Sequence, residues 1–162
     1  MKLRNFLYIS SGLITSICGA VISFFSIIPL LLGGLVKTLF ESSYELVEGF
    51  VTEMAKADSK YEYLLDYSKA EAIDYVVKVV RIVCLVFLII GILNLVFGII
   101  NIRLRNSHDR VFAGKTWKKV VFVVFAWLIN GLNLISSVAT TVAVFLKVSN
   151  TQENKLYSVN DN

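Results

Sequence analysis

Two short motifs in the chain have residue types that could do chemistry, and they lie close together. His108 is the only histidine, and Asp109 follows it. One histidine and one aspartate are too few ligands to hold zinc, and no cysteine lies near them in the sequence. The sequence also lacks a nucleophile with a placed acid–base partner. We therefore interpret His108 as a solvated loop residue.

The second motif, Gly114-Lys115-Thr116, matches the end of a phosphate-binding P-loop. The full pattern also requires a glycine five residues before Gly114, where this chain has Asp109. Thr116 is better explained as the cap of the following helix, with Trp117 as an interfacial aromatic residue. We expect no catalytic residue, no metal site and no cofactor, and thus a protein that is not an enzyme.

Small and polar residues recur within the apolar parts of the chain and favour helix packing. In the middle of the chain they follow 3-4-3 spacing, which places them on one helical face. An unpaired amide in hydrocarbon costs several kcal/mol, and Asn94 and Asn130 are expected at similar depths, so we predict that these two contact each other. A path for a solute or ion and a seam between copies are the alternative interpretations. The predicted packing residues are Gly91, Asn94, Gly98, Asn101, Asn130 and Asn133. The first apolar stretch carries a separate small-residue face, which would let another helix approach closely: Gly12, Ser16, Gly19, Ala20, Ser23 and Ser26.

The elements that must position these residues are three long apolar stretches, 6–36, 76–102 and 120–148. No charged residue occurs at 6–36, 82–102 or 120–146, and about 20 apolar residues suffice to cross a bilayer. The chain is 56% hydrophobic with a mean hydropathy of +0.71. The sequence predicts an all-α integral membrane protein, a single membrane domain over 1–162 with three transmembrane helices.

The first stretch is too long for one straight span. As a helix, residues 6–36 would measure about 46 Å, against a hydrocarbon core of about 30 Å. Pro29 removes a backbone donor and favours a kink. We predict a spanning helix over about 6–28, retained as a signal anchor, and a bent or interfacial continuation from 29 to about 40.

Residues 37–74 are polar and acidic, and we expect them to form an extracytoplasmic amphipathic helical segment. Serine and glutamate three residues apart at Ser42, Ser59 and Ser68 predict three capping boxes. A helix over 43–57 should bury one face against the outer leaflet, the 60–75 segment or a partner protein. A solvated hairpin and a disordered loop are the alternatives to a partner surface. The candidate face consists of Phe40, Tyr44, Val47, Val51 and Met54.

Basic residues set the expected orientation. The predicted inner loop 103–119 carries Arg103, Arg105, Arg110, Lys115, Lys118 and Lys119. The positive-inside rule then places the N-terminus in the cytoplasm and the C-terminus outside the plasma membrane, with a disordered tail over 149–162. Because these cations lie at the ends of spans without interleaved stacking aromatics, we expect no nucleic-acid partner.

This plan is common among small bacterial multi-pass membrane proteins. We expect a non-enzymatic protein acting through protein–protein contacts, as an accessory or assembly subunit of an envelope or transport complex. Its expected partners are membrane lipid and other membrane proteins or itself. The alternatives are a small channel or transporter protomer active as a homo-oligomer, and an immunity-type membrane protein.

Overall fold

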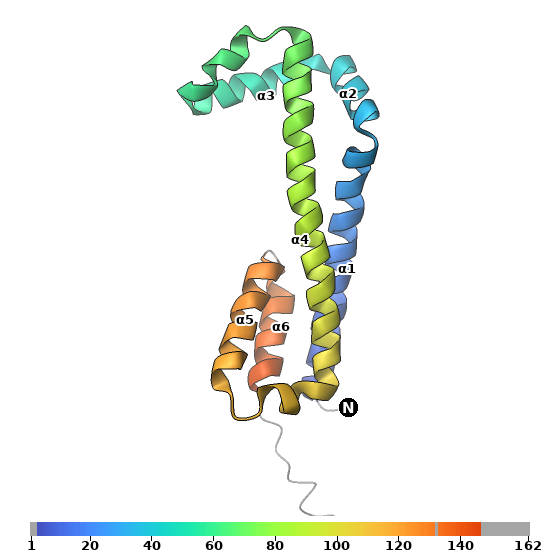
Figure 1. Cartoon of the computed structure of the whole chain (residues 1–162), viewed down its shortest axis with the longest axis vertical. Coiled ribbons are helices and arrows are strands. Elements are labelled where there is room, and N and C mark those ends of the chain that lie inside the picture. Colours follow the sequence, from blue (N-terminus) through green and yellow to red (C-terminus); the bar gives the residue numbers. More distant parts are fainter. Residues whose placement is uncertain (1–2, 132, 147–162) are drawn as a thin grey trace, which may run out of the picture. The chain divides into compact units, whose positions relative to one another are not determined.

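The structure is a computed structural model that describes residues 3–131 and 133–146. All secondary structure in these ranges is helical, which confirms the predicted all-α class. The elements, shown in Figure 1, are α1 (Leu3–Leu31), α2 (Gly33–Ser42), α3 (Tyr44–Ala57), the 3₁₀ helix η1 (Ser59–Asp66), α4 (Lys69–Phe112), α5 (Thr116–Asn130) and α6 (Leu134–Phe145).

Two helices of the described chain, α1 and α4, are long and apolar enough to cross a membrane. The first behaves as Pro29 predicts, because α1 ends at Leu31 and α2 begins at Gly33. At Leu32 the backbone leaves helical conformation (φ −99°, ψ 34°), and the Val36 amide donates to the Leu32 carbonyl at 3.1 Å in the first turn of α2. The helix thus breaks two residues after Pro29, and α2 continues the chain to Ser42.

The third predicted span is wrong as one continuous helix. Residues 120–148 contribute to two helices, α5 with 15 residues and α6 with 12, which pack side by side as a hairpin (Figure 1). Their lengths are about 22 and 18 Å, less than a hydrocarbon core of about 30 Å. Gly131 at φ +40° ends α5, and the Asn133 side chain accepts the Ser136 amide at 3.1 Å to begin α6. The predicted tail 149–162 lies outside the described residues.

The predicted basic loop 103–119 is also mostly helical. The α4 helix continues to Phe112, and Gly114 at φ +63° turns the chain toward α5. Lys115 is the N-cap of α5 and makes no side-chain capping bond, so the predicted capping role of Thr116 is wrong. Because α4 carries its basic residues on a helix, their directions are set by helical geometry.

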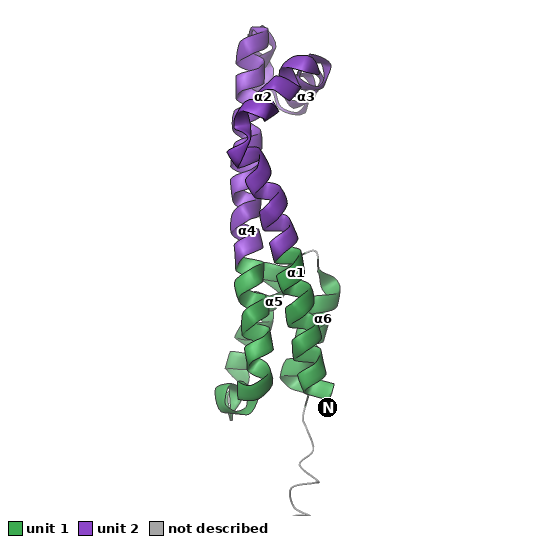
Figure 2. Cartoon of the chain, turned by 90° about the vertical axis from the view of Figure 1, so that its right-hand side faces the viewer, with its two compact units in different colours: residues 1–19, 93–162 green, residues 20–92 purple. Residues whose placement is uncertain are grey.

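The chain divides into two compact units, shown in Figure 2. Unit 1 comprises residues 1–19 and 93–162, and unit 2 comprises residues 20–92. A core cluster of buried apolar residues in unit 1 comprises Tyr8, Leu104, Phe112, Ala143 and Val144. A second core cluster, in unit 2, comprises Val47, Val51, Leu64, Ala72, Ile73, Val76 and Val77.

Residues 33–80 of unit 2 form a small helical cap around that second core. Val47 is 0% exposed and Val51 is 5% exposed, while Phe40, Tyr44 and Met54 are partly buried against them. The expected burial of this face is confirmed, and its cover includes Leu64, Ala72 and Ile73 from the following segment. The cap thus closes over its own apolar face.

One of the three predicted capping boxes forms. Glu71 accepts from the Ser68 amide at 2.9 Å and from its hydroxyl at 2.6 Å, at the start of α4. The other two predictions are wrong. Asp58 caps η1 through the Lys60 amide, whereas Ser42 is the last residue of α2, and Ser43 precedes α3 without a side-chain capping bond. Asp74 pairs with Lys37 at 2.7 Å, which ties α2 to α4 within the cap.

Candidate functional site

The candidate site is a line of polar side chains in unit 1 that begins on one face of α1. Arg4, Tyr8, Ser11 and Thr15 follow 4-3-4 spacing, so they point to the same side of that helix. Their partners come from α4 and from the α5–α6 hairpin. A polar face that is buried among helices must find hydrogen bonds there, and this one does.

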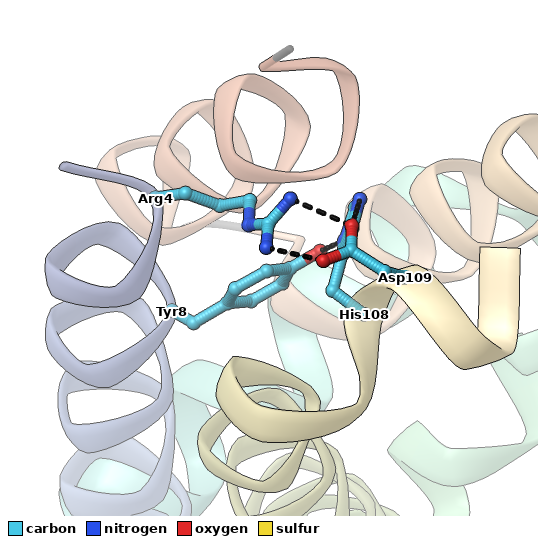
Figure 3. A network of polar contacts seen from close by, with 4 residues as sticks. All are labelled: Arg4, Tyr8, His108 and Asp109. Carbon is cyan, nitrogen blue, oxygen red and sulfur yellow. Dashed lines mark hydrogen bonds and ion pairs between the residues drawn. The ribbon is translucent and has the colours of Figure 1, made fainter. Parts of the chain in front are cut away.

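At the start of α1, two contacts join it to the end of α4 (Figure 3). Arg4 donates two hydrogen bonds to the Asp109 carboxylate, at 2.8 and 2.9 Å. The Tyr8 hydroxyl lies 2.7 Å from Nδ1 of His108. Tyr8 is fully buried, His108 is 4% exposed, and the Asp109 side chain is largely exposed. The ion pair therefore lies at the surface beside a buried aromatic hydrogen bond.

The expectation of a solvated His108 is wrong. Its ring packs between Tyr8 and Phe112, with ring centroids 5.7 and 5.1 Å away. Burial lowers the pKa of His108 and the positive charge of Arg4 lowers it further, against an opposing effect of Asp109. The neutral imidazole is thus favoured, with Nδ1 free to accept from Tyr8.

For Asp109, by contrast, the surroundings favour the charged form, the carboxylate. The hydrogen bonds from Arg4 are the largest cause that lowers the pKa of Asp109, and the charges of Arg4, His108 and Lys119 act in the same direction. A bidentate guanidinium–carboxylate pair fixes both the charge and the geometry of its two members. Arg4 thus connects the first turn of α1 to the last turns of α4.

Further along α1, hydroxyl groups join it to α6. Ser11 donates to the Ser136 carbonyl and Ser136 donates to the Ser11 carbonyl, both at 3.1 Å. Ser11 also bonds the Thr140 hydroxyl, and Thr15 bonds the Ser136 hydroxyl. All four side chains are fully buried. The reciprocal bonds explain why a helix as short as α6 holds its place.

Asparagines complete the line from α4 and α5. Asn101 donates to Thr140 at 3.2 Å and to Ser11 at 3.4 Å. Asn130 accepts from Thr15 at 3.0 Å, and Asn133 donates to the Cys18 sulfur at 3.5 Å. The buried amides Asn94, Asn101 and Asn130 therefore bond groups on neighbouring helices, and Asn133, half-buried at the N-cap of α6, bonds α1.

The predicted pair of Asn94 and Asn130 takes a different form. Asn94 donates to the backbone carbonyl of Ile129, the residue before Asn130, at 3.1 Å. Among the described residues, Nδ2 of Asn130 has no hydrogen-bond partner, while its Oδ1 accepts from Thr15 on α1. The α4 and α5 helices thus meet at the predicted level, but through an amide and a backbone group.

The predicted glycine face brings α1 and α4 into close contact. A methyl group added at Gly98 would lie 2.6 Å from the Gly12 carbonyl and would overlap the Ser16 hydroxyl. One added at Gly12 would lie 2.6 Å from the Gly98 carbonyl. These positions require glycine because the backbones approach so closely. Gly91, at the other end of this stripe, is buried in unit 2.

Chemically, this site offers hydroxyl, amide, imidazole and one paired carboxylate. Among the described residues, no group of three or more histidine, cysteine, aspartate or glutamate side chains could hold a metal ion. The asparagines of this site were predicted from the sequence, whereas Arg4, Tyr8, Ser11 and Thr15 were not. Their 4-3-4 spacing indicates that they share one helical face. The small residues on another face of the same helix were interpreted as its packing surface instead.

Comparison with protein-family models, with curated proteins and with solved structures finds no match to this chain. Its function is therefore inferred from the placement and chemistry of its own side chains.

Proposed function

We propose that this is a non-enzymatic multi-pass membrane protein in which the charge-free parts of α1 and α4 cross the bilayer. Both helices have the required length and composition. Large apolar side chains on them face outward, for example Phe24, Phe25 and Leu85. A water-soluble protein would bury most of such a surface, whereas a lipid-exposed helix needs it.

In this proposal the α5–α6 hairpin enters the membrane without crossing it. Its two helices are too short to span, and its polar residues bond α1 and α4 within unit 1. Irregular backbone at membrane depth is tolerated where protein covers it. The start of α5 and the end of α6 then lie on the same side of the membrane as the first residues of α1. This arrangement replaces the C-out topology that a third span implied. The basic residues favour the cytoplasm for that side.

The cap is then extracytoplasmic, and we assign it the protein–protein contacts of an accessory or assembly subunit in an envelope or transport complex. The observation that carries this assignment is the outer face of α3. Its inner face is closed over the cap's own core, yet Leu46 is 69% exposed and Phe50 is 41% exposed, one helical turn apart. An apolar pair left over after the cap has folded is a candidate contact for another protein.

Charges beside this pair indicate the chemistry of the partner. Glu45 and Glu48 are exposed next to Leu46, and Glu53 is exposed one turn after Phe50. Carboxylates at these positions oppose insertion of the face into hydrocarbon. They suit a partner with an apolar centre and a basic rim, because interfaces place charged groups around a desolvated core.

A site-specific photocrosslink tests this assignment in intact cells. Benzoylphenylalanine in place of Phe50 should give one discrete adduct with a different protein, and Leu46→Asp should abolish it. The same crosslinker in place of Glu62, an exposed residue of η1, is the position control and should give no such adduct. Circular dichroism of the Leu46→Asp variant checks that the cap still folds.

Each other outcome has a definite meaning. An adduct of the chain with itself alone would favour the channel or transporter protomer active as a homo-oligomer. Equal crosslinking at Phe50 and Glu62 would show unspecific contact. Absence of any adduct at Phe50 would defeat the assignment of this face.

A further inference from the structure

Unit 1 carries a concentration of positive charge at one end of its helices. We use the term basic surface for the side chains that contribute it beyond Arg4. These are Arg103, Arg105, Arg110, Lys115, Lys118 and Lys119. They come from the last turns of α4, the connection after it and the first turn of α5.

Little negative charge opposes this surface. In the described part of unit 1, the one carboxylate is Asp109, and Arg4 holds it with two hydrogen bonds. No member of the basic surface forms an ion pair with another residue in the described ranges. Asp109 is already paired with Arg4, so it does not neutralise the basic surface. The net charge of the basic surface is therefore positive.

Its position along the helices matches the headgroup region of a bilayer. Arg103 directly follows the charge-free stretch 82–102, and Lys119 directly precedes the charge-free stretch 120–146. Trp117 is 64% exposed, with the Lys118 ammonium 5.9 Å from its ring. Exposed tryptophan beside lysine, next to apolar helix, is the composition of a membrane interface.

We propose that the basic surface binds the headgroups of anionic phospholipids in the leaflet that it faces. Lysine and arginine attract the phosphodiester charge, and arginine can bind two of its oxygens at once. Clusters of four to eight such residues beside a membrane helix have this property, and each contributes roughly fivefold in affinity. The inference rests on the membrane embedding proposed above and adds a class of lipid ligand to it.

The test uses the full-length protein in nanodiscs that contain equal amounts of phosphatidylcholine and phosphatidylglycerol. Native mass spectrometry then measures which lipid stays bound after release from the disc. We expect phosphatidylglycerol to be retained at least tenfold over phosphatidylcholine. Combined Arg110→Gln, Lys115→Gln and Lys118→Gln substitutions should remove that preference.

Two further variants separate charge from other effects. Lys56→Gln, Lys60→Gln and Lys69→Gln together remove the same charge from the cap and should leave the preference intact. Lys115→Arg and Lys118→Arg keep the charge and should also leave it intact. Glycerol 3-phosphate at millimolar concentration should not displace the lipid, because the headgroup binds as part of a bilayer surface.

If the incorporated wild-type protein retains phosphatidylcholine and phosphatidylglycerol equally, the binding of anionic headgroups is refuted. The proposed membrane embedding is not affected by that result. Equal loss of preference in the cap variant would refute the headgroup binding too, as would displacement by glycerol 3-phosphate, which points to a site for a free anion. Failure of the wild-type chain to incorporate would count against the membrane embedding, and with it the lipid surface.

Discussion

Tyr8 and His108 lie 100 positions apart in the sequence, and the Tyr8 hydroxyl is 2.7 Å from His108 Nδ1. The bond is buried, and Arg4 and Asp109 form an ion pair beside it. Removal of the hydroxyl would leave a buried imidazole nitrogen without a partner. Such a loss costs more than the small net gain of an average hydrogen bond.

Tyr8→Phe should lower the free energy of unfolding by about 1–3 kcal/mol, because it leaves Nδ1 of His108 unsatisfied. Thermal unfolding of the detergent-solubilised protein, followed by circular dichroism, measures the change. Tyr44→Phe removes a hydroxyl from the cap and serves as the control, with an expected change within about 0.5 kcal/mol. Equal effects of the two substitutions would contradict the assigned role of Tyr8.

Unfolding stability should fall as the pH decreases below about 6.5, the ordinary pKa of histidine. The pKa of His108 is lowered in the folded protein by burial and by Arg4, so the unfolded chain takes up a proton before the folded one. Arg4, Asp109 and Lys119 are the charged groups that act on this imidazole. Melting temperatures between pH 7.5 and 5 measure the loss.

His108→Gln should flatten that pH dependence, because glutamine does not titrate. Asp109 does not produce the same trend in this range, since the pKa of its carboxyl is lowered by Arg4 and it stays ionised at pH 5. A His108→Gln variant with the unchanged pH slope would assign the effect to another group.

Gly98→Ala should destabilise the protein by about 1–3 kcal/mol, as expected for overpacking a close helix contact. The added methyl would meet the Gly12 carbonyl at 2.6 Å and the Ser16 side chain. Gly49→Ala is the matched control in α3, where the added methyl meets nothing within 4 Å. That control should stabilise by about 0.5–1 kcal/mol through helix propensity. Opposite signs in unfolding experiments would support the α1–α4 contact.

Val47→Ala should lower the free energy of unfolding by about 2 kcal/mol, since Val47 is fully buried in the core of the cap. Leu46→Ala, its exposed neighbour, should change stability by less than about 0.5 kcal/mol. Limited proteolysis of the cap can compare the two variants. Equal susceptibility would mean that the inner and outer faces of α3 are assigned wrongly.

Cysteines introduced at Gly114 and Leu146 should react with an impermeant reagent from the same side of the membrane, and one at Glu53 from the other. The expectation follows from the hairpin, whose second helix runs back toward the start of the first (Figure 1). Replacement of Cys18 and Cys84 by alanine gives the background for labelling. Reaction of the Leu146 and Glu53 positions from one side would restore a third span.

The kink and the cap could be predicted because their causes are local. Pro29 interrupts its own helix, and the 4-3-4-3 spacing that includes Val47 and Val51 defines one face of α3. Burial of that face needed a partner, and the sequence offered three candidates. Which of the three covers this face depends on how η1 and the first turns of α4 fold back over α3. No local sequence pattern predicts that tertiary arrangement.

The hairpin and the His108 contact were missed for a different reason. Residues 120–146 are apolar enough for one span, and Asn133 was interpreted as a packing residue instead of part of a turn that follows Gly131. His108 lies beyond a charge-free stretch, in a basic segment that resembled a loop. Because α4 continues as a helix through Phe112, the His108 side chain points inward. Its contact with Tyr8 depends on the tertiary packing of α1 against α4.

The placement of α6 has a consequence for biosynthesis. Its hydrogen-bond partners on α1, Ser11 and Thr15, are made 121 to 129 residues earlier. Until α6 emerges, Ser11 and Thr15 lack their partners Ser136 and Thr140 and have only Asn101 and Asn130 as hydrogen-bond partners on the helices already made. A chain terminated before residue 134 would contain both long helices and still display polar groups without their partners. The interactions that hold α6 against α1 therefore form late, after both long helices have been made.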